Sequence, residues 1–294
     1  MPGTPNSQDW QGLLAAFWAS PFWEGTKSLA NANFTTALLG SLAGAFAGAY
    51  VAQRIAERHK ERDELLRELR STNAAITLAF TVCNSLLSLK RQHLRDMLST
   101  FEAERNALLE HKRKRDIGQI QGNAAYRFRA DFRNLPTTVL PTDTLRDTVL
   151  SKVSAHARPL SLVASIVEYS ALLNGAIVKR NELSLRFRSL VESQDPDVPA
   201  RYFGLPYQGG HIDAEYSDAL LGIGNYADDV IFYSYLLCQD LFQHGTALRK
   251  RFEARHGSGA PKVSEVKFDE AKASGLLPDE SHYKSWMTAF VREQ

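Results

Sequence analysis

The sequence predicts a mainly α-helical protein with a single N-terminal transmembrane helix, a charged helical stalk and a cytoplasmic helical bundle that carries one or two short strands. Three observations lead to this fold class. Residues 34–52 contain no charged side chain, and the residues after them are rich in both acids and bases. Beyond residue 70, apolar residues recur three, four and seven positions apart over several long segments, as they do in packed helices.

The composition limits the classes of function. A net charge of +2 and a pI of about 8.5 give no reason to expect a nucleic-acid partner. The two cysteines, Cys83 and Cys238, lie in apolar helical patterns and predict buried thiols in a reducing compartment. The sequence has no phosphate-binding glycine loop, paired-cysteine zinc motif, nucleophile elbow or helical zinc-protease motif. We therefore expect no cofactor and no metal.

Residues 1–33 are predicted to form a tail with a short interfacial helix. The apolar stretch that begins at Asp9 is too short to span a bilayer. Trp10, Trp18 and Trp23 are amphipathic rings of the kind that settle at the level of the lipid headgroups. These residues are predicted to lie at the membrane interface.

Residues 34–52 are predicted to form the transmembrane helix. As a helix, this stretch would be about 29 Å long, close to the hydrocarbon thickness of a bilayer. Gly40, Gly44 and Gly48 recur every fourth residue and form a glycine zipper on which a second helix can pack closely. The span therefore predicts self-association. The alternative is a glycine-rich helix buried in a soluble bundle.

Residues 53–115 are predicted to form the stalk and a long packing helix. Arg54, Arg58 and Arg62 follow the span directly, whereas Lys27 is the only base before it. The positive-inside rule then places the C-terminal residues in the cytoplasm. We expect a single-pass protein of the cell inner membrane, with a break in the helix at residues 71–73.

A heptad series predicts a helix-packing seam along the second half of this segment, with members Leu66, Phe80, Leu87, Leu94, Phe101 and Leu108 on one series and Leu69, Ile76, Cys83 and Met97 on the other. Polar interruptions favour an antiparallel partner in the same chain over a long coiled coil. Residues 71–89 are uncharged, so a second span is the alternative to a buried core helix. The helix is expected to end near Gly118, and the bases of 111–115 either complement its dipole or bind a polyanion.

Residues 116–256 are predicted to form the helical bundle. We expect a strand over 126–132 with Arg127, Arg129 and Arg133 on its wet face, a helix from Thr142 to about residue 157 capped by residues 142–144, and a helix from Pro159 toward residue 190. A long loop over 193–216 then leads into a helix over 217–256. Residues 257–294 are predicted to add a brief strand over 263–268 and a docked helix that begins near Asp279.

Three sets of side chains are candidates for catalytic or metal-binding groups. His211 and Asp213 lie in the long loop with Glu215, while Asp240 and His244 are one helical turn apart. Arg251 and His256 have the arginine–histidine spacing of certain all-helical ribonucleases. Arg54 and His59 repeat that spacing at the expected membrane face, so it carries little weight. No catalytic residue is assigned.

These patterns predict a membrane-anchored, non-enzymatic interaction or scaffold protein; its more specific form is an oligomerising membrane effector with a cytoplasmic sensing bundle. Its expected partners are the lipid bilayer, a second copy of the span and a cytoplasmic protein of unknown identity. The alternative is an all-helical ribonuclease-like or metal-dependent enzyme tethered to the membrane.

Overall fold

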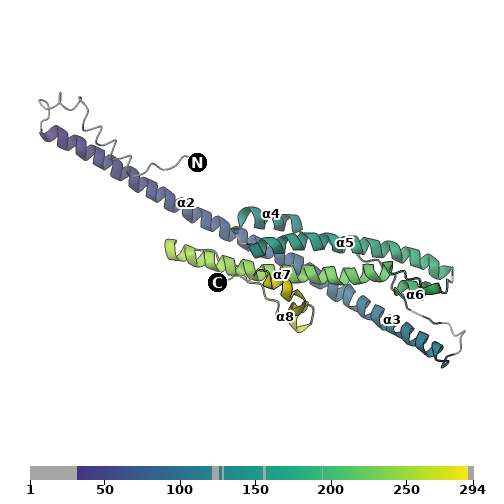
Figure 1. Cartoon of the computed structure of the whole chain (residues 1–294). Coiled ribbons are helices and arrows are strands. Elements are labelled where there is room, and N and C mark those ends of the chain that lie inside the picture. Colours follow the sequence, from purple (N-terminus) through teal and green to yellow (C-terminus); the bar gives the residue numbers. More distant parts are fainter. Residues whose placement is uncertain (1–31, 121–125, 128, 155–156, 194, 291–294) are drawn as a thin grey trace. The chain divides into compact units, whose positions relative to one another are not determined.

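The structure, a computed structural model, describes residues 32–120, 126–127, 129–154, 157–193 and 195–290 (Figure 1). Helices make up 78% of it, which confirms the predicted mainly helical fold. No strand occurs among these residues, so the predicted short strands are wrong. The chain divides into two compact units, residues 1–63 and 64–294.

The first unit, as far as it is described, consists of the N-terminal part of helix α2 (Ala32–Leu89). Every described side chain from Ala37 to Lys60 is exposed. Seven of them are large and apolar: Leu38, Leu39, Leu42, Phe46, Tyr50, Val51 and Ile55. The exposed fraction reaches 73% for Phe46. We refer to residues 37–60 as the exposed arm.

In the second unit α2 continues into a π-helical segment, η2 (Lys90–Leu94), and then into α3 (Arg95–Asp116). The break expected at residues 71–73 is wrong, because the polar side chains there form hydrogen bonds with backbone groups of the packed structure. Thr72 is fully buried and donates to the carbonyl of Glu68 at 2.9 Å. The Asn73 side chain donates to the carbonyl of Lys262 and accepts from the Ser264 N–H, both at 2.9 Å. The helix is therefore uninterrupted here.

The predicted heptad seam is largely buried. Of its ten members, only Leu66 and Phe80 are half-buried, and the other eight are buried. Residues 72–89 belong to this core: Ala75, Ala79 and Val82 have no exposed surface. The seam therefore serves as a core helix of the second unit. Helix α3 ends as expected, with Gly118 at φ +74°.

Helices α5 (Ala157–Glu192) and α7 (Glu215–His256) pack antiparallel along most of their length (Figure 1). The core faces predicted for them are buried, from Val163 to Ile177 in α5 and from Ile223 to Phe252 in α7. The shorter α4 (Thr142–Lys152) packs on α5. Its predicted cap is wrong, because Pro141 holds the cap position and no side chain bonds the first turn.

The connection between α5 and α7 is more ordered than expected. It contains α6 (Val198–Tyr202) and the 3-10 turn η3 (Gln208–Gly210). Tyr202 is buried and stacks on Tyr216 with ring centroids 4.3 Å apart. Phe101, Phe187 and Phe203 contact these rings at centroid distances of 4.9–6.5 Å. This aromatic cluster joins α3, α5, α6 and α7.

The described residues of the predicted strand over 126–132 belong to an irregular segment that continues to residue 140, and no strand lies beside it in the described part of the chain. Side chains of α5 bond its backbone instead. The Asn174 side chain accepts from the Thr138 N–H at 2.8 Å and donates to its carbonyl at 3.0 Å. Asn181 bonds both backbone groups of Leu135 in the same way, at 3.0 and 2.8 Å.

Arg188 adds a third rung by donating to the carbonyl of Phe132 at 2.6 Å. We call these three interactions the α5 ladder. Its members are seven residues apart in the helix and three apart in the segment. Seven helical residues rise about 10.5 Å and three extended residues about 10 Å, so the two repeats stay in register.

Arg180 secures the same segment from inside the core. Its side chain has no exposed surface, and its guanidinium donates to the carbonyls of Asp131 and Arg133. The Tyr216 hydroxyl also donates to the Asp131 carbonyl, at 3.0 Å. The Tyr202 hydroxyl accepts from the Asp131 N–H at 3.1 Å. These bonds satisfy backbone groups that a partner strand would otherwise pair.

The C-terminal residues pack on α2 and α7 without the predicted strand over 263–268, because Asn73 bonds the backbone of that segment. Short helices follow: α8 (Asp269–Ala273), η4 (Glu280–Tyr283) and α9 (Lys284–Thr288). Asp279 caps η4 by accepting from the Ser281 N–H at 2.8 Å, as its position predicts. Tyr283 stacks on Phe232 with centroids 3.8 Å apart, which docks these turns on α7.

The α5 ladder predicts the effect of Asn181→Ala. Leu135 is 3% exposed, so its N–H and C=O would lose their partners away from water. The free energy of unfolding should fall by roughly 1–3 kcal/mol. Urea unfolding of the full chain in detergent measures this change. Asn225→Ala, at an exposed position of α7, is the matched control; equal stability of the two variants would contradict the ladder's role.

Candidate functional site

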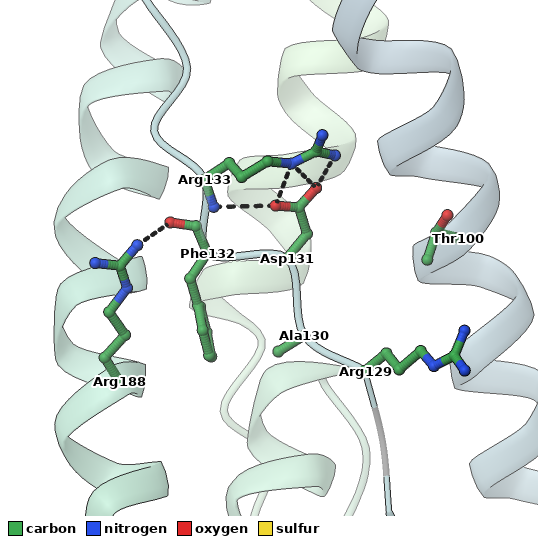
Figure 2. A pocket seen from close by; sticks show the side chains of 7 residues that line it. All are labelled: Thr100, Arg129, Ala130, Asp131, Phe132, Arg133 and Arg188. Carbon is green, nitrogen blue, oxygen red and sulfur yellow. Dashed lines mark hydrogen bonds and ion pairs between the residues drawn. The ribbon is translucent and has the colours of Figure 1, made fainter.

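A hollow of about 460 Å³ lies where α3, the 126–140 segment and α5 meet. Figure 2 shows the seven residues that line it: Thr100, Arg129, Ala130, Asp131, Phe132, Arg133 and Arg188. In this view Arg188 stands on one side, and Arg129 stands on the other with Thr100. We call this feature the arginine hollow.

Hydrogen bonds fix much of the hollow's lining. Arg133 forms an ion pair with Asp131, with its Nη2 2.5 Å from a carboxylate oxygen (Figure 2). Burial acts to raise the pKa of the Asp131 carboxyl, but hydrogen bonds and charge from Arg133 bring it below its usual range. Asp131 is therefore ionised at neutral pH, and Arg133 is held in place by it.

Arg129 is positioned differently. Its backbone N–H donates to the Glu104 carboxylate at 3.3 Å, and the same oxygen accepts from the Tyr126 hydroxyl. Glu104 thus anchors the segment to α3 through the backbone of Arg129. Within the described part of the chain, no ion pair occupies the Arg129 guanidinium. The hollow therefore presents a charged donor that is still available.

The lining residues carry three guanidinium groups and one carboxylate, and the Asp96 carboxylate lies 3.9 Å from Nη2 of Arg133 beside them. The backbone carbonyls of residues 131–133 are already bonded to Arg180, Tyr216 and Arg188. Few acceptors therefore remain beside many donors.

A second pocket, of about 410 Å³, has the opposite charge. Lys90, the first residue of the π-helical segment, forms an ion pair with Asp228 at 2.5 Å. Burial raises the pKa of the neighbouring Asp229 carboxyl, which accepts from the Tyr283 hydroxyl at 2.8 Å.

The described residues contain no group of three histidine, cysteine or acidic side chains that could hold a metal ion.

The loop residues that are candidate metal ligands include two acids that form ion pairs with basic side chains instead. Asp213 lies 2.9 Å from an Arg186 nitrogen and 3.5 Å from Nε of Arg201. Glu215 is bound by Arg186 and by Lys179. His211 is exposed and forms an isolated bridge to Tyr207. Asp213 thus contributes to an ion-pair cluster on α5 and α6.

Asp240 and His244 have separate partners. The Asp240 carboxylate is bound by the Arg158 guanidinium, with 2.8 Å to its Nε. His244 Nε2 lies 3.0 Å from the Glu68 carboxylate, which also accepts from the Ser154 N–H at 2.9 Å. Glu68 therefore joins α2, α7 and the residues that follow α4.

The residues of the ribonuclease alternative lie at the end of α7. Arg251 is exposed, and the half-buried His256 packs its ring 5.2 Å from that of Phe252. Arg54 and His59 both lie on the exposed arm.

The membrane-related residues divide between described and undescribed parts of the chain. Gly40, Gly44 and Gly48 lie on the exposed arm, and no described atom comes within 4 Å of a Cβ built on any of them. Of the arginines predicted to lie at the membrane interface, Arg54 and Arg58 lie on the same arm and Arg62 follows it; all three are exposed. Trp10, Trp18 and Trp23 lie outside the described residues.

Two helices are long and apolar enough to cross a membrane, namely the continuous helix Ala37–Asp116 and α5. Half of the residues in the most apolar stretch of the first, and a third in the second, are buried within the protein. The buried faces of residues 72–89 and of α5 are those of core helices. Length and composition alone do not distinguish such helices from spans.

Sequence reasoning missed Arg180 and Arg188. Arg180 shares the buried face of α5 with Ile177, Ser184 and Phe187, so a base at a core position of an apolar helix face was the available signal. Arg188 continues the seven-residue spacing of Asn174 and Asn181. The α5 ladder can be recognised only once the 132–138 segment is placed beside α5, and periodicity in the sequence does not predict that placement.

The Glu68 contact predicts a pH-dependent stability. Burial acts to raise the pKa of Glu68, but hydrogen bonds from Ser154 and His244 bring it below its ordinary value. Its contribution is therefore present above the unfolded-state pKa and is lost as the pH falls through the lower folded-state pKa. We expect Glu68→Gln to reduce the free energy of unfolding by roughly 1 kcal/mol at pH 7 and by less at pH 3.

Urea unfolding at both pH values measures this difference. The matched control is Glu102→Gln, at an exposed position of α3. A constant difference between Glu68→Gln and the wild type from pH 7 to pH 3 would contradict the proposed ionisation of Glu68.

Comparison of the chain with protein-family models, with curated proteins and with solved structures found no match of any kind.

Proposed function

We propose that this protein is a membrane-anchored interaction or scaffold protein that self-associates through residues 34–52 and carries a helical bundle on the cytoplasmic side. The exposed arm carries this proposal. Its seven large apolar side chains remain exposed, whereas the equally uncharged residues 72–89 are used in the core. Exposed apolar surface of this extent marks a membrane or protein contact.

Basic residues support the orientation. Arg54 and Arg58 directly follow the apolar stretch, and the bases on this side outnumber the single Lys27 before it. Bases beside a span are retained on the cytoplasmic side. The second unit, residues 64–294, would then lie in the cytoplasm, where a protein partner can reach it. An inner-membrane location follows for a bacterial cell.

The glycines support self-association. In the second unit, glycines are used where helices pack closely: a Cβ on Gly224 would come within 2.9 Å of Leu98 in α3, and one on Gly245 within 3.3 Å of Thr72 in α2. The same test at Gly40, Gly44 and Gly48 finds no described neighbour. A second copy of the helix would supply the missing contact, since small residues let helix backbones approach in a bilayer.

The anchor predicts that the full chain stays in the membrane pellet after alkaline carbonate washing. Deletion of residues 1–56 should release the remaining chain into the soluble fraction, because the exposed apolar side chains of the span are removed. Immunoblotting of the two fractions measures this. Recovery of the full chain in the soluble fraction would rule out the anchor.

The orientation is tested in the same preparation. Protease added to sealed, right-side-out vesicles should leave a C-terminal epitope intact and should remove it once the vesicles are opened. Cleavage of the epitope before opening would show that the C-terminal unit faces outward.

Self-association predicts the effect of Gly44→Leu. A leucine at this position places a bulky side chain where the helix backbones should meet, so crosslinked oligomers in membranes should decrease about tenfold. Chemical crosslinking followed by immunoblotting measures this. Ala43→Leu is the matched control, because it adds the same side chain next to the glycine positions without filling them. Unchanged crosslinking of Gly44→Leu would contradict the glycine contact.

A further inference from the structure

We propose that one face of α5 docks on the same face of a second copy of this chain, with the two helices antiparallel. The contact belongs to the second unit, so it is separate from the proposed self-association through residues 34–52. Six exposed residues, spaced four and three apart in turn, lie on one side of the helix. We call them the α5 outer face: Glu168, Leu172, Gly175, Lys179, Glu182 and Arg186.

The outer face and its surroundings leave apolar surface without a partner in the described chain. Leu172 and Val178 are 41% and 46% exposed, and no described atom comes within 4 Å of a Cβ built on Gly175. Val139 extends this surface, because its neighbour Thr138 is bonded to α5 and its own side chain is 98% exposed. Contiguous apolar surface of this kind marks a contact site.

The charged residues of the outer face distinguish between a protein and a bilayer as its occupant. Helix α5 is long and apolar enough to cross a membrane. However, Glu168, Lys179, Glu182 and Arg186 are exposed on the same side as the apolar residues and would face lipid. Charged side chains are costly in hydrocarbon. A protein surface with complementary charges therefore fits this face better than lipid does.

The outer face is complementary to itself in one antiparallel alignment. When Leu172 lies opposite Gly175 of the second copy, Glu168 lies opposite Lys179 of the second copy, and the two-fold axis repeats both pairs. A large side chain then meets the residue that has none, and an acid meets a base. The other two charged residues of the face fall opposite serines of the second copy. A parallel alignment in register would instead place every charge opposite itself.

Contacts within the chain leave this alignment open. Lys179 forms an ion pair with Glu215 at 3.4 Å, but its side chain is 54% exposed and can contact a second acid. A pair of single helix faces suits a weak contact. Two copies tethered through the exposed arm would meet at a high effective concentration, and this step alone rests on the proposed function.

Crosslinking of the full chain, purified in dodecyl maltoside, tests the contact. A cysteine is placed at an exposed position of α5, in Gly175→Cys or in Ser189→Cys, and a short bismaleimide is added. The native Cys83 and Cys238 are buried. In the proposed alignment the two copies of residue 175 are about 4.5 Å apart along the helix axes and those of residue 189 about 46 Å, so Gly175→Cys should form roughly ten times more crosslinked dimer.

Equal crosslinking at the two positions, or no dimer with Gly175→Cys, overturns the proposal. Residue 175 reports the α5 contact alone. Its result is therefore independent of the Gly44→Leu experiment, which reports the contact through the span.

A charge exchange tests the alignment. In the Gly175→Cys chain, Glu168→Lys places like charges opposite each other and should reduce crosslinking about tenfold. Addition of Lys179→Glu should restore it. The matched control is Glu192→Lys, which makes the same charge change at an exposed position of α5 away from the outer face. A thermal melt of each variant separates lost association from lost folding. If folded Glu168→Lys/Lys179→Glu protein does not recover the crosslink, or if Glu192→Lys reduces it equally, the alignment is wrong.

Discussion

The second unit depends on how its extended segments pair their backbone without a β-sheet. A buried N–H or C=O must find a partner, and a chain that runs beside helices has no strand to provide one. Here the partners are side chains of α5 and α2. Asn174, Asn181 and Arg188 bond the 132–138 segment, and Asn73 bonds residues 262 and 264. These interactions place both segments on the helices.

This pairing also forms the arginine hollow. The 131–133 carbonyls are turned toward Arg180, Tyr216 and Arg188, so their acceptors are used within the protein. Arg129 and Arg133 lie at the surface, on a segment whose backbone is held by these hydrogen bonds. The charge of the hollow therefore follows from the same constraint as the fold. A regular sheet at this position would have distributed these arginines along one exposed strand face.

Much of the helical fold could be predicted from periodicity, because helix faces repeat over many residues. The seam from Leu66 to Leu108 and the buried faces of α5 and α7 follow directly from such repeats. The strands over 126–132 and 263–268 were wrong, since alternation shows that a segment is extended but not what pairs its backbone. The break at residues 71–73 was wrong for the same reason. Asn73 and Thr72 resemble loop residues in sequence, yet they bond groups within a packed helix. The hollow could not be predicted, because Thr100, Arg129 and Arg188 come together only through tertiary packing.

The two uncharged stretches of α2 show how the environment decides the role of similar sequences. Residues 72–89 bury about half of their side chains against the other helices of the second unit, including α7, with the methyl and methylene groups of Val82 and Leu86 fully buried. Residues 37–52 carry comparable apolar groups, but Phe46 and Leu39 keep 73% and 64% of their surface exposed. Each large apolar side chain left in water forgoes roughly 1.5–3 kcal/mol of burial free energy. Seven such residues on one helix therefore forgo an amount of burial free energy comparable to the stability of a whole domain. In the proposed arrangement, the bilayer provides the apolar environment for the arm that the other helices of the second unit provide for residues 72–89. The glycines add the close helix contact that lipid cannot provide.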